Sequence, residues 1–244
     1  MIEGTLQELL YVSTCVILLS MGLVISLRRP SGYSTGRVFL ALYFWAYFLT
    51  AAITYVVLTP GLLTMLPHLA RWAMFFFLMI LPFSYLYVRA NLKSQELRWR
   101  DALCFLPAIV YLVDYAPFFL KSGTEKLAIM QSLNAVNIRS GYQEGWMLPP
   151  LTWGWLRYLV IAGFWIAQGR VIYRSLYSAR SKMEPGRKSE RTWFLWLQIT
   201  QLFIFLPSLV LYLMDRRDLV VVFGNIGALI VAGVQGYFLL LKPE

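Results

Sequence analysis

Asp114 is the side chain in this sequence that most needs an explanation, because it lies within an apolar stretch long enough to cross a membrane. The stretch covers residues 102–120, and a helical rise of about 1.5 Å per residue places Asp114 roughly two turns inside its outer end. A lone carboxylate at that depth costs on the order of 2–3 kcal/mol. Asp114 therefore requires a partner, a water-filled cavity or a raised pKa.

Three other polar residues are expected at a similar depth. Arg71 and Arg157 lie in the outer first turns of two further apolar stretches, and Asn225 lies on the last one. These side chains predict a polar outer cavity that binds a ligand and is capped by the tryptophan-rich segment before Arg157. The alternative is a shorter fourth stretch with Asp114 at the membrane interface. The predicted ligand-binding residues are Asp114, Arg71, Arg157, Asn225, Trp146 and Trp153.

Amide side chains recur in the inner halves of the last two apolar stretches. Gln198 and Gln201 lie on one stretch and Gln235 on the other. Amides at matching depth can hydrogen-bond between helices, and each such bond contributes on the order of 1 kcal/mol. We expect these residues either to hold the helices together or to act as a conformational switch.

Small residues on the last apolar stretch recur every four positions. This spacing places them on one helix face, where a neighbouring backbone can approach closely. The predicted helix-packing residues are Gly224, Ala228, Ala232 and Gly236.

The sequence lacks the residues that several membrane activities require. His68 is the only histidine, and Cys15 and Cys104 are the only cysteines, which argues against a metal or haem site. No lysine lies inside the last apolar stretch, so a retinal Schiff base is excluded. Asp215 lies at an outer helix end and does not give Asp114 the partner that an intramembrane protease needs. We therefore predict no catalytic residues, no metal and no cofactor, and hence no enzyme.

The elements that must position these residues are helices that cross a membrane. Hydrophobic residues make up 59% of the 244 positions and charged residues only 14%, against about 45–50% and about 25% in soluble domains. We therefore predict an all-α, polytopic integral membrane protein, a bundle of seven transmembrane helices forming one domain over residues 1–244. Each span needs about 20 apolar residues. The predicted spans are 6–27, 38–59, 71–92, 102–120, 153–173, 193–214 and 219–241.

The distribution of positive charge predicts the orientation of the bundle. The net charge of +10 raises the alternative of nucleic-acid binding. Most of the 22 Lys and Arg residues, however, follow the first, third, fifth and seventh spans. Basic residues gather on cytoplasmic loops, where they also contact anionic lipid. We therefore expect the N-terminus outside, the C-terminus inside, a bacterial inner-membrane location and no direct nucleic-acid binding by this chain. Glu3 and Glu8 stand where a signal peptide would carry basic residues, so we expect no cleavage there.

Two connecting segments are long. The basic inner loop, residues 174–192, contains Pro185 and Gly186 as helix breakers. The outer loop, residues 121–152, is apolar, and Leu127 and Met130 are spaced like one face of a short helix that continues to Leu133 and Ile138. An exposed loop of this kind is expected to fold back over the bundle as a lid or to lie in the interface.

Short residue patterns resemble the seven-transmembrane input domain of membrane-bound AraC-type transcriptional regulators of the Bacteroidetes type. The patterns are FLMILPFSYLYVR at 77–89, RWRDALCFLPAIVYL at 98–112, EGWMLPP at 144–150 and YFLLLKPE at 237–244. In that family a DNA-reading helix-turn-helix domain follows the last span, whereas this sequence ends at Glu244. The resemblance implies signalling to a cytoplasmic output domain or partner, and homodimerisation.

Together these observations predict a membrane-embedded sensory module. It would bind a small extracytoplasmic or lipid-borne ligand, contact membrane lipid and pass a conformational change to the cytoplasm. The alternative is a small-solute transporter or channel, because polar residues occur at two depths and could form a continuous path.

Overall fold

The computed structural model describes residues 2–27, 35–93, 98–132, 145–149, 152–178, 187–214 and 217–241, and the regular elements in these ranges are all helices. Helices form because long apolar runs must satisfy their backbone hydrogen bonds within the segment itself. The fold is therefore all-α, as the composition predicts. The long helices are α1 (Ile2–Leu27), α2 (Thr35–Leu58), α4 (Trp72–Lys93), α9 (Thr152–Ser178), α10 (Arg187–Leu213) and α11 (Arg217–Leu241).

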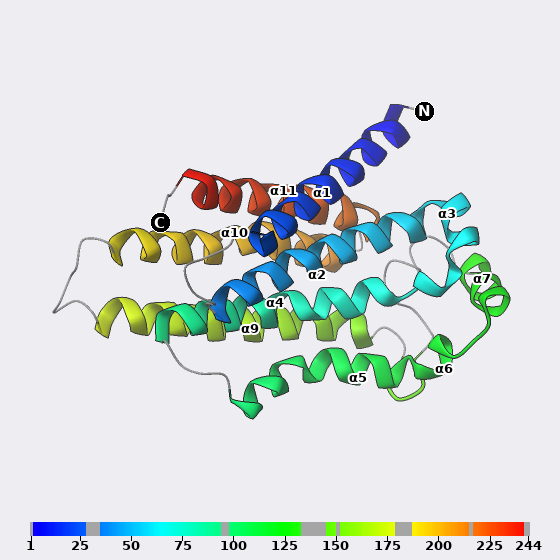
Figure 1. Ribbon diagram of the computed structural model, residues 1–244. Coiled ribbons are helices and arrows are strands. Elements are labelled where there is room, and N and C mark those ends of the chain that lie inside the picture. Colours follow the sequence, from blue (N-terminus) through cyan, green and yellow to red (C-terminus); the bar gives the residue numbers. More distant parts are fainter. Residues whose placement is uncertain are drawn as a thin grey trace.

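The six long helices form a closed ring. In order around it, α1 packs on α2, α2 on α4, α4 on α9, α9 on α10, α10 on α11, and α11 on α1 (Figure 1). The first turns of α1 lie at the same end as α3 and α7, and the last turns of α11 lie at the other end. The shorter elements are α3 (Pro60–Met65), η1 (Pro67–Leu69), η2 (Trp99–Phe105), α5 (Leu106–Asp114), α6 (Ala116–Phe119) and α7 (Gly123–Ser132).

Four helices in the described ranges are long and apolar enough to cross a membrane, which indicates an integral membrane protein. The apolar segments are Glu8–Leu27, Thr35–Leu58, Trp72–Leu92 and Thr192–Leu213, and a shorter one is Val222–Tyr237. Large apolar side chains on them remain exposed, for example Leu9, Val16 and Phe203, as expected of surfaces that face lipid. Of the seven predicted spans, helix length and composition thus support four.

The predicted span 102–120 is not one continuous helix. It begins as the 3-10 helix η2, continues as α5, breaks at Tyr115 and resumes as the four-residue α6. Pro117 lies in the first turn of α6, where its missing N–H cannot continue the hydrogen bonding of α5. The chain therefore turns directly after Asp114.

The long connections are more helical than the sequence suggests. α9 continues to Ser178 and α10 begins at Arg187, so both enter the predicted inner loop 174–192, of which residues 179–186 lie outside the described ranges. In the predicted outer loop 121–152, α7 buries Met130 and partly buries Leu127 as expected. Leu133 and Ile138 lie outside the described ranges.

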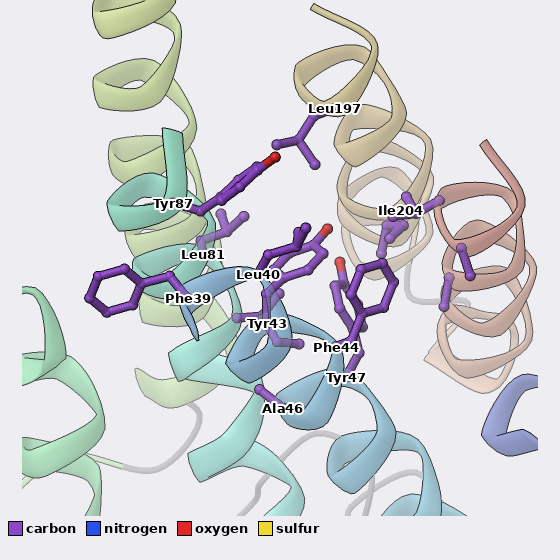
Figure 2. Packing of buried hydrophobic residues seen from close by; sticks show 14 of the residues in the cluster. Phe39, Leu40, Tyr43, Phe44, Ala46, Tyr47, Leu81, Tyr87, Leu197 and Ile204 are labelled. Carbon is purple, nitrogen blue, oxygen red and sulfur yellow. The ribbon is translucent and has the colours of Figure 1, made fainter. Parts of the chain in front are cut away.

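Two groups of buried apolar side chains fill the bundle. The larger joins the ring helices and is rich in α2 aromatics, among them Tyr43, Phe44 and Tyr47, which Figure 2 shows directed towards α10 and α11. The smaller joins α4, α5, α7 and the start of α9 around Tyr111 and Trp153. Buried aromatic side chains in both groups thus hold together the helices that surround the interior of the bundle.

Among the glycines of α11, the closest neighbouring backbone lies at Gly227, which is not one of the four predicted packing residues. A Cβ there would lie 2.8 Å from Ile204 Cα on α10. Ala228 and Ala232 are buried, and Gly236 faces the Met21 sulfur at 3.4 Å. Gly224, in contrast, has open space where a Cβ would lie. The predicted packing face of α11 is therefore closely packed at Ala228, Ala232 and Gly236 and open at Gly224.

Gly227→Ala is expected to lower the free energy of unfolding by about 1–3 kcal/mol, because its methyl group must displace the α10 backbone. Gly233→Ala is the control on the same helix, since nothing lies within 4 Å of its added Cβ, and it is expected to be neutral or stabilising. Denaturant unfolding in mixed micelles, followed by tryptophan fluorescence, measures both. Equal effects of the two variants would contradict close packing at Gly227.

η2 is attached to α4 by a charged contact. Asp101 Oδ1 accepts from Arg89 Nη1, and Asp101 Oδ2 accepts from the Arg98 backbone N–H at 2.8 Å. Burial raises the pKa of Asp101, but these hydrogen bonds and the two positive charges outweigh burial and hold the pKa below its ordinary value. The contact therefore stabilises the fold at neutral pH.

Because the folded-state pKa of Asp101 is the lower one, its contribution is complete above the unfolded pKa and is lost as pH falls through the folded pKa. Wild-type protein is expected to lose more stability between about pH 5 and pH 3 than Asp101→Asn, which has no carboxylate to protonate. Unfolding midpoints across this pH range in detergent test the difference. Parallel pH profiles for the two proteins would rule out this role for Asp101.

Candidate functional site

A cavity of about 220 Å³ lies inside the ring, and all six long helices contribute to its wall. Its lining is mostly apolar, with Phe77, Ile80 and Phe205 among the wall residues. The polar lining comprises Arg71, Arg157, Asn225, Ser208, Thr50, Thr54 and several tyrosines. An apolar chamber with a few convergent polar groups is the usual form of a small-molecule site.

Arg71 enters the cavity wall from an unusual backbone position. It lies between η1 and α4 with φ at 72°, a value that residues other than glycine rarely adopt and that costs energy. Its carbonyl oxygen accepts from the Tyr111 hydroxyl at 2.8 Å, and its side chain is only 7% exposed. The surrounding contacts therefore hold Arg71 in a strained backbone conformation, and its positive charge lies at the cavity wall.

Arg157 is held by aromatic rings. Its guanidinium lies 4.7 Å from the centroid of the Tyr158 ring and 5.3 Å from that of Tyr212, and Nη2 donates to the Tyr158 hydroxyl at 3.1 Å. The Tyr158 hydroxyl in turn donates to the Ser208 carbonyl at 3.0 Å, which links α9 to α10. Arg157 Nε is buried and has no hydrogen-bond partner among the described residues. Arg157 therefore brings a cation of fixed orientation to the cavity wall.

Asp114 is not among the residues that line the cavity. Its side chain is fully buried and accepts from the backbone N–H groups of Met147 (2.7 Å) and Leu148 (3.1 Å) and from Trp153 Nε1 (2.6 Å). A Cβ on Gly145 would overlap the same carboxylate. The structure thus satisfies Asp114 with donors from residues 145–149, here called the cap segment, and from α9.

The two predicted tryptophans have different positions. Trp146 is 64% exposed, lies outside the cavity lining and donates from Nε1 to the Val113 carbonyl at 2.7 Å. Trp153 is buried, and its ring lines the cavity while its indole N–H holds Asp114. Its ring also meets Tyr111 edge-on at 5.1 Å. Trp153 therefore connects the Asp114 anchor to the wall that carries Arg71.

Of the six predicted ligand-binding residues, the structure brings Arg71, Arg157, Asn225 and Trp153 to one cavity and places Asp114 and Trp146 beside it. Tyr158, Tyr212 and Ser208, which orient Arg157, have no distinguishing sequence pattern. Among the described residues, no group of three or more His, Cys, Asp or Glu side chains could hold a metal ion.

A second polar site lies among α4, α9 and α10. Gln168 Nε2 donates to Gln198 Oε1 at 2.8 Å and to Gln201 Oε1 at 3.2 Å, and its Oε1 accepts from Ser84 Oγ at 2.9 Å. Gln201 Nε2 closes the network by donating to Ser84 Oγ at 2.7 Å. Gln198 and Gln201 are among the amides predicted from the sequence, whereas Gln168 and Ser84 are not, although Gln168 is an amide within an apolar stretch.

Gln235 does not join this network. Its amide is fully buried, and neither side-chain atom has a hydrogen-bond partner among the described residues. The hydroxyls of Tyr43 and Tyr47 on α2 likewise lack a partner at full hydrogen-bond distance and angle. The Tyr43 hydroxyl nevertheless interacts with the side chains of Gln201, Gln235 and Tyr47, and Tyr47 also lines the cavity. We call Tyr43, Tyr47 and Gln235 the unpaired niche, which adjoins the cavity at Tyr47.

One cationic group outside the cavity is also buried. Lys126 on α7 donates from Nζ to the Phe119 carbonyl at 2.8 Å and lies 3.1 Å from His68 Nδ1. Burial lowers the pKa of Lys126. These contacts hold α7 against η1 and α6 and place no charge in the cavity, because neither residue lines it.

Comparisons with protein-family models, curated proteins and solved structures find no match to this chain. The functional argument therefore depends on the cavity and on the polar groups around it.

Asp114→Asn is expected to reduce the free energy of unfolding by about 2–4 kcal/mol, because the amide N–H₂ would face the Trp153 N–H and leave a buried donor unpaired. Trp146→Phe, which removes only the hydrogen bond to Val113, is the milder control, at about 1 kcal/mol. Thermal unfolding in detergent gives both values. If Asp114→Asn proves as stable as wild type, Asp114 does not anchor the cap segment.

Proposed function

We propose that this chain is a membrane-embedded binding module of the sensory type. It spans the bilayer seven times, with its N-terminus outside and its C-terminus in the cytoplasm, and it takes an extracytoplasmic or lipid-borne ligand into the cavity. The observation that carries this proposal is the cavity itself, which six helices share and into which Arg71 and Arg157 bring positive charge. The excess of basic residues after odd-numbered spans supports the orientation.

The position of the cavity gives a bound ligand a means of changing the bundle. Its wall includes Tyr158 and Ser208, whose hydrogen bond joins α9 to α10, and Tyr47, which adjoins the unpaired niche. A ligand shifts the helices only if it binds one arrangement more tightly than another, and a difference of about 1.4 kcal/mol changes the populations tenfold. The output domain or partner that would read this change is proposed from the sequence resemblance.

The unpaired niche favours a second candidate function, a small-solute transporter. Tyr43, Tyr47 and Gln235 extend the polar surface beyond the cavity towards the amide network around Gln168. A transporter would open this polar path to the cytoplasmic side, whereas a sensor keeps it closed. The two functions therefore differ in which residues a reagent can reach from each side.

Cysteine accessibility in proteoliposomes of known orientation separates the two functions. In a background without Cys15 and Cys104, Gly224→Cys, which lines the cavity, is expected to react with an impermeant thiol reagent from the outer face only. Gln235→Cys is expected to react from neither face, and Gly163→Cys, with open space around its Cβ, serves as a lipid-facing control. Reaction of Gln235→Cys from the inner face would favour the transporter, and reaction of Gly224→Cys from the inner face alone would refute the sensor.

A further inference from the structure

We propose that the cavity selects an amphiphile with an oxyanion head, a carboxylate or phosphate, on an apolar body, and that Arg157 and Arg71 bind the head. This inference rests on the proposed function, in which the cavity is the ligand site. It adds the chemical class of the ligand, and the charge, donor geometry and wall composition of the cavity carry it.

The charge of the cavity wall favours an anion. Arg157 and Arg71 both line the cavity, and none of the described residues that line it is acidic. A cation inside an apolar bundle is unfavourable, and a nearby anion offsets that cost. A bound oxyanion would supply that charge to Arg157 from within the cavity.

The geometry of Arg157 is the second observation. The rings of Tyr158 and Tyr212 and the hydrogen bond from Nη2 fix the plane of the guanidinium. Arginine donors lie in a rigid fork that matches the oxygens of carboxylates and phosphates, so a guanidinium fixed at the cavity wall is already oriented for an oxyanion.

The third observation is that the cavity wall is largely apolar. Beside the arginines it is formed by apolar side chains, among them Val57, Phe77, Ile80, Ile204, Phe205 and Val220. The volume of about 220 Å³ exceeds that of an engineered apolar cavity of about 150 Å³ that binds benzene. A small hydrated anion would leave this surface in contact with water, whereas an anion that carries a hydrocarbon tail would cover it.

The experiment measures binding to the protein in nanodiscs of phosphatidylcholine. Dodecanoate and dodecyl phosphate are added separately, with dodecanol as the neutral control, and acetate and inorganic phosphate as the controls without a tail. We expect saturable thermal stabilisation by at least one of the long-chain anions and none by the three controls. The two long-chain probes distinguish a fatty-acid head from a phospholipid-type head.

Variants then locate the binding site. Arg157→Gln is expected to weaken binding of the stabilising anion at least tenfold, and Arg157→Lys to restore part of it. Arg170→Gln is the matched control, because it removes the same charge from an exposed position on the same helix. Gly224→Leu, which fills open space at the cavity wall, is expected to abolish binding. Size-exclusion profiles and unfolding midpoints show that each variant is folded.

The inference is overturned if neither long-chain anion binds saturably, if dodecanol binds as tightly, if the tailless anions bind as tightly, or if Arg157→Gln binds like Arg170→Gln. Failure of the proposed function is recognised separately, by labelling of Gly224→Cys from the inner face alone. Binding of dodecanol that Gly224→Leu abolishes would leave the cavity as a ligand site and reject only the requirement for an anion.

Discussion

The arrangement of this bundle depends on one constraint, that polar groups inside an apolar assembly of helices must find partners there. Each buried group left without a hydrogen bond costs about 1–3 kcal/mol, and lipid offers no replacement. Asp114 meets this constraint with two backbone N–H groups and an indole N–H. Gln168 meets it with three side chains from two other helices. These contacts fix the cap segment and the α4–α9–α10 contact respectively.

The same constraint gives meaning to the groups that remain without partners in the described residues. Arg157, whose Nε is one of these groups, lines the cavity, and Tyr47 joins the cavity to Tyr43 and Gln235. A structure that pairs Asp114 and Gln168 so fully is expected to pair its other buried groups too. We therefore interpret the unpaired atoms as positions where a bound molecule or ordered water completes the hydrogen bonding.

How far the sequence predicts this structure depends on whether a residue acts through its own helix or through a distant contact. Composition and apolar length predict membrane helices, and four segments meet the length and hydropathy required. Apolar length does not predict the break at Tyr115, where Pro117 and the Asp114 contacts end α5. A regular spacing of small residues identifies a helix face but misses Gly227, because the direction of closest approach depends on where α10 lies.

The candidate site shows the same difference between residues that act through their own helix and residues that act through distant contacts. Arg71, Arg157 and Asn225 are polar residues placed within apolar stretches, and their expected depth already groups them. The depth of Asp114 predicts that it needs partners, and the structure supplies two backbone N–H groups of the cap segment and the indole N–H of Trp153. Backbone donors carry no residue-type signal, so the sequence assigns Asp114 to the ligand instead. Gln168 is visible as an amide, yet its four-residue network with Gln198, Gln201 and Ser84 depends on three helices meeting at one level.

An experimental structure of the protein purified in nanodiscs with its native lipids retained tests this account most directly. The account predicts non-protein density in the cavity, with its head about 2.7–3.2 Å from the Arg157 guanidinium and its tail along Phe77 and Phe205. A cavity without density, or an Arg157 guanidinium bonded to a carboxylate of the chain itself, would contradict it.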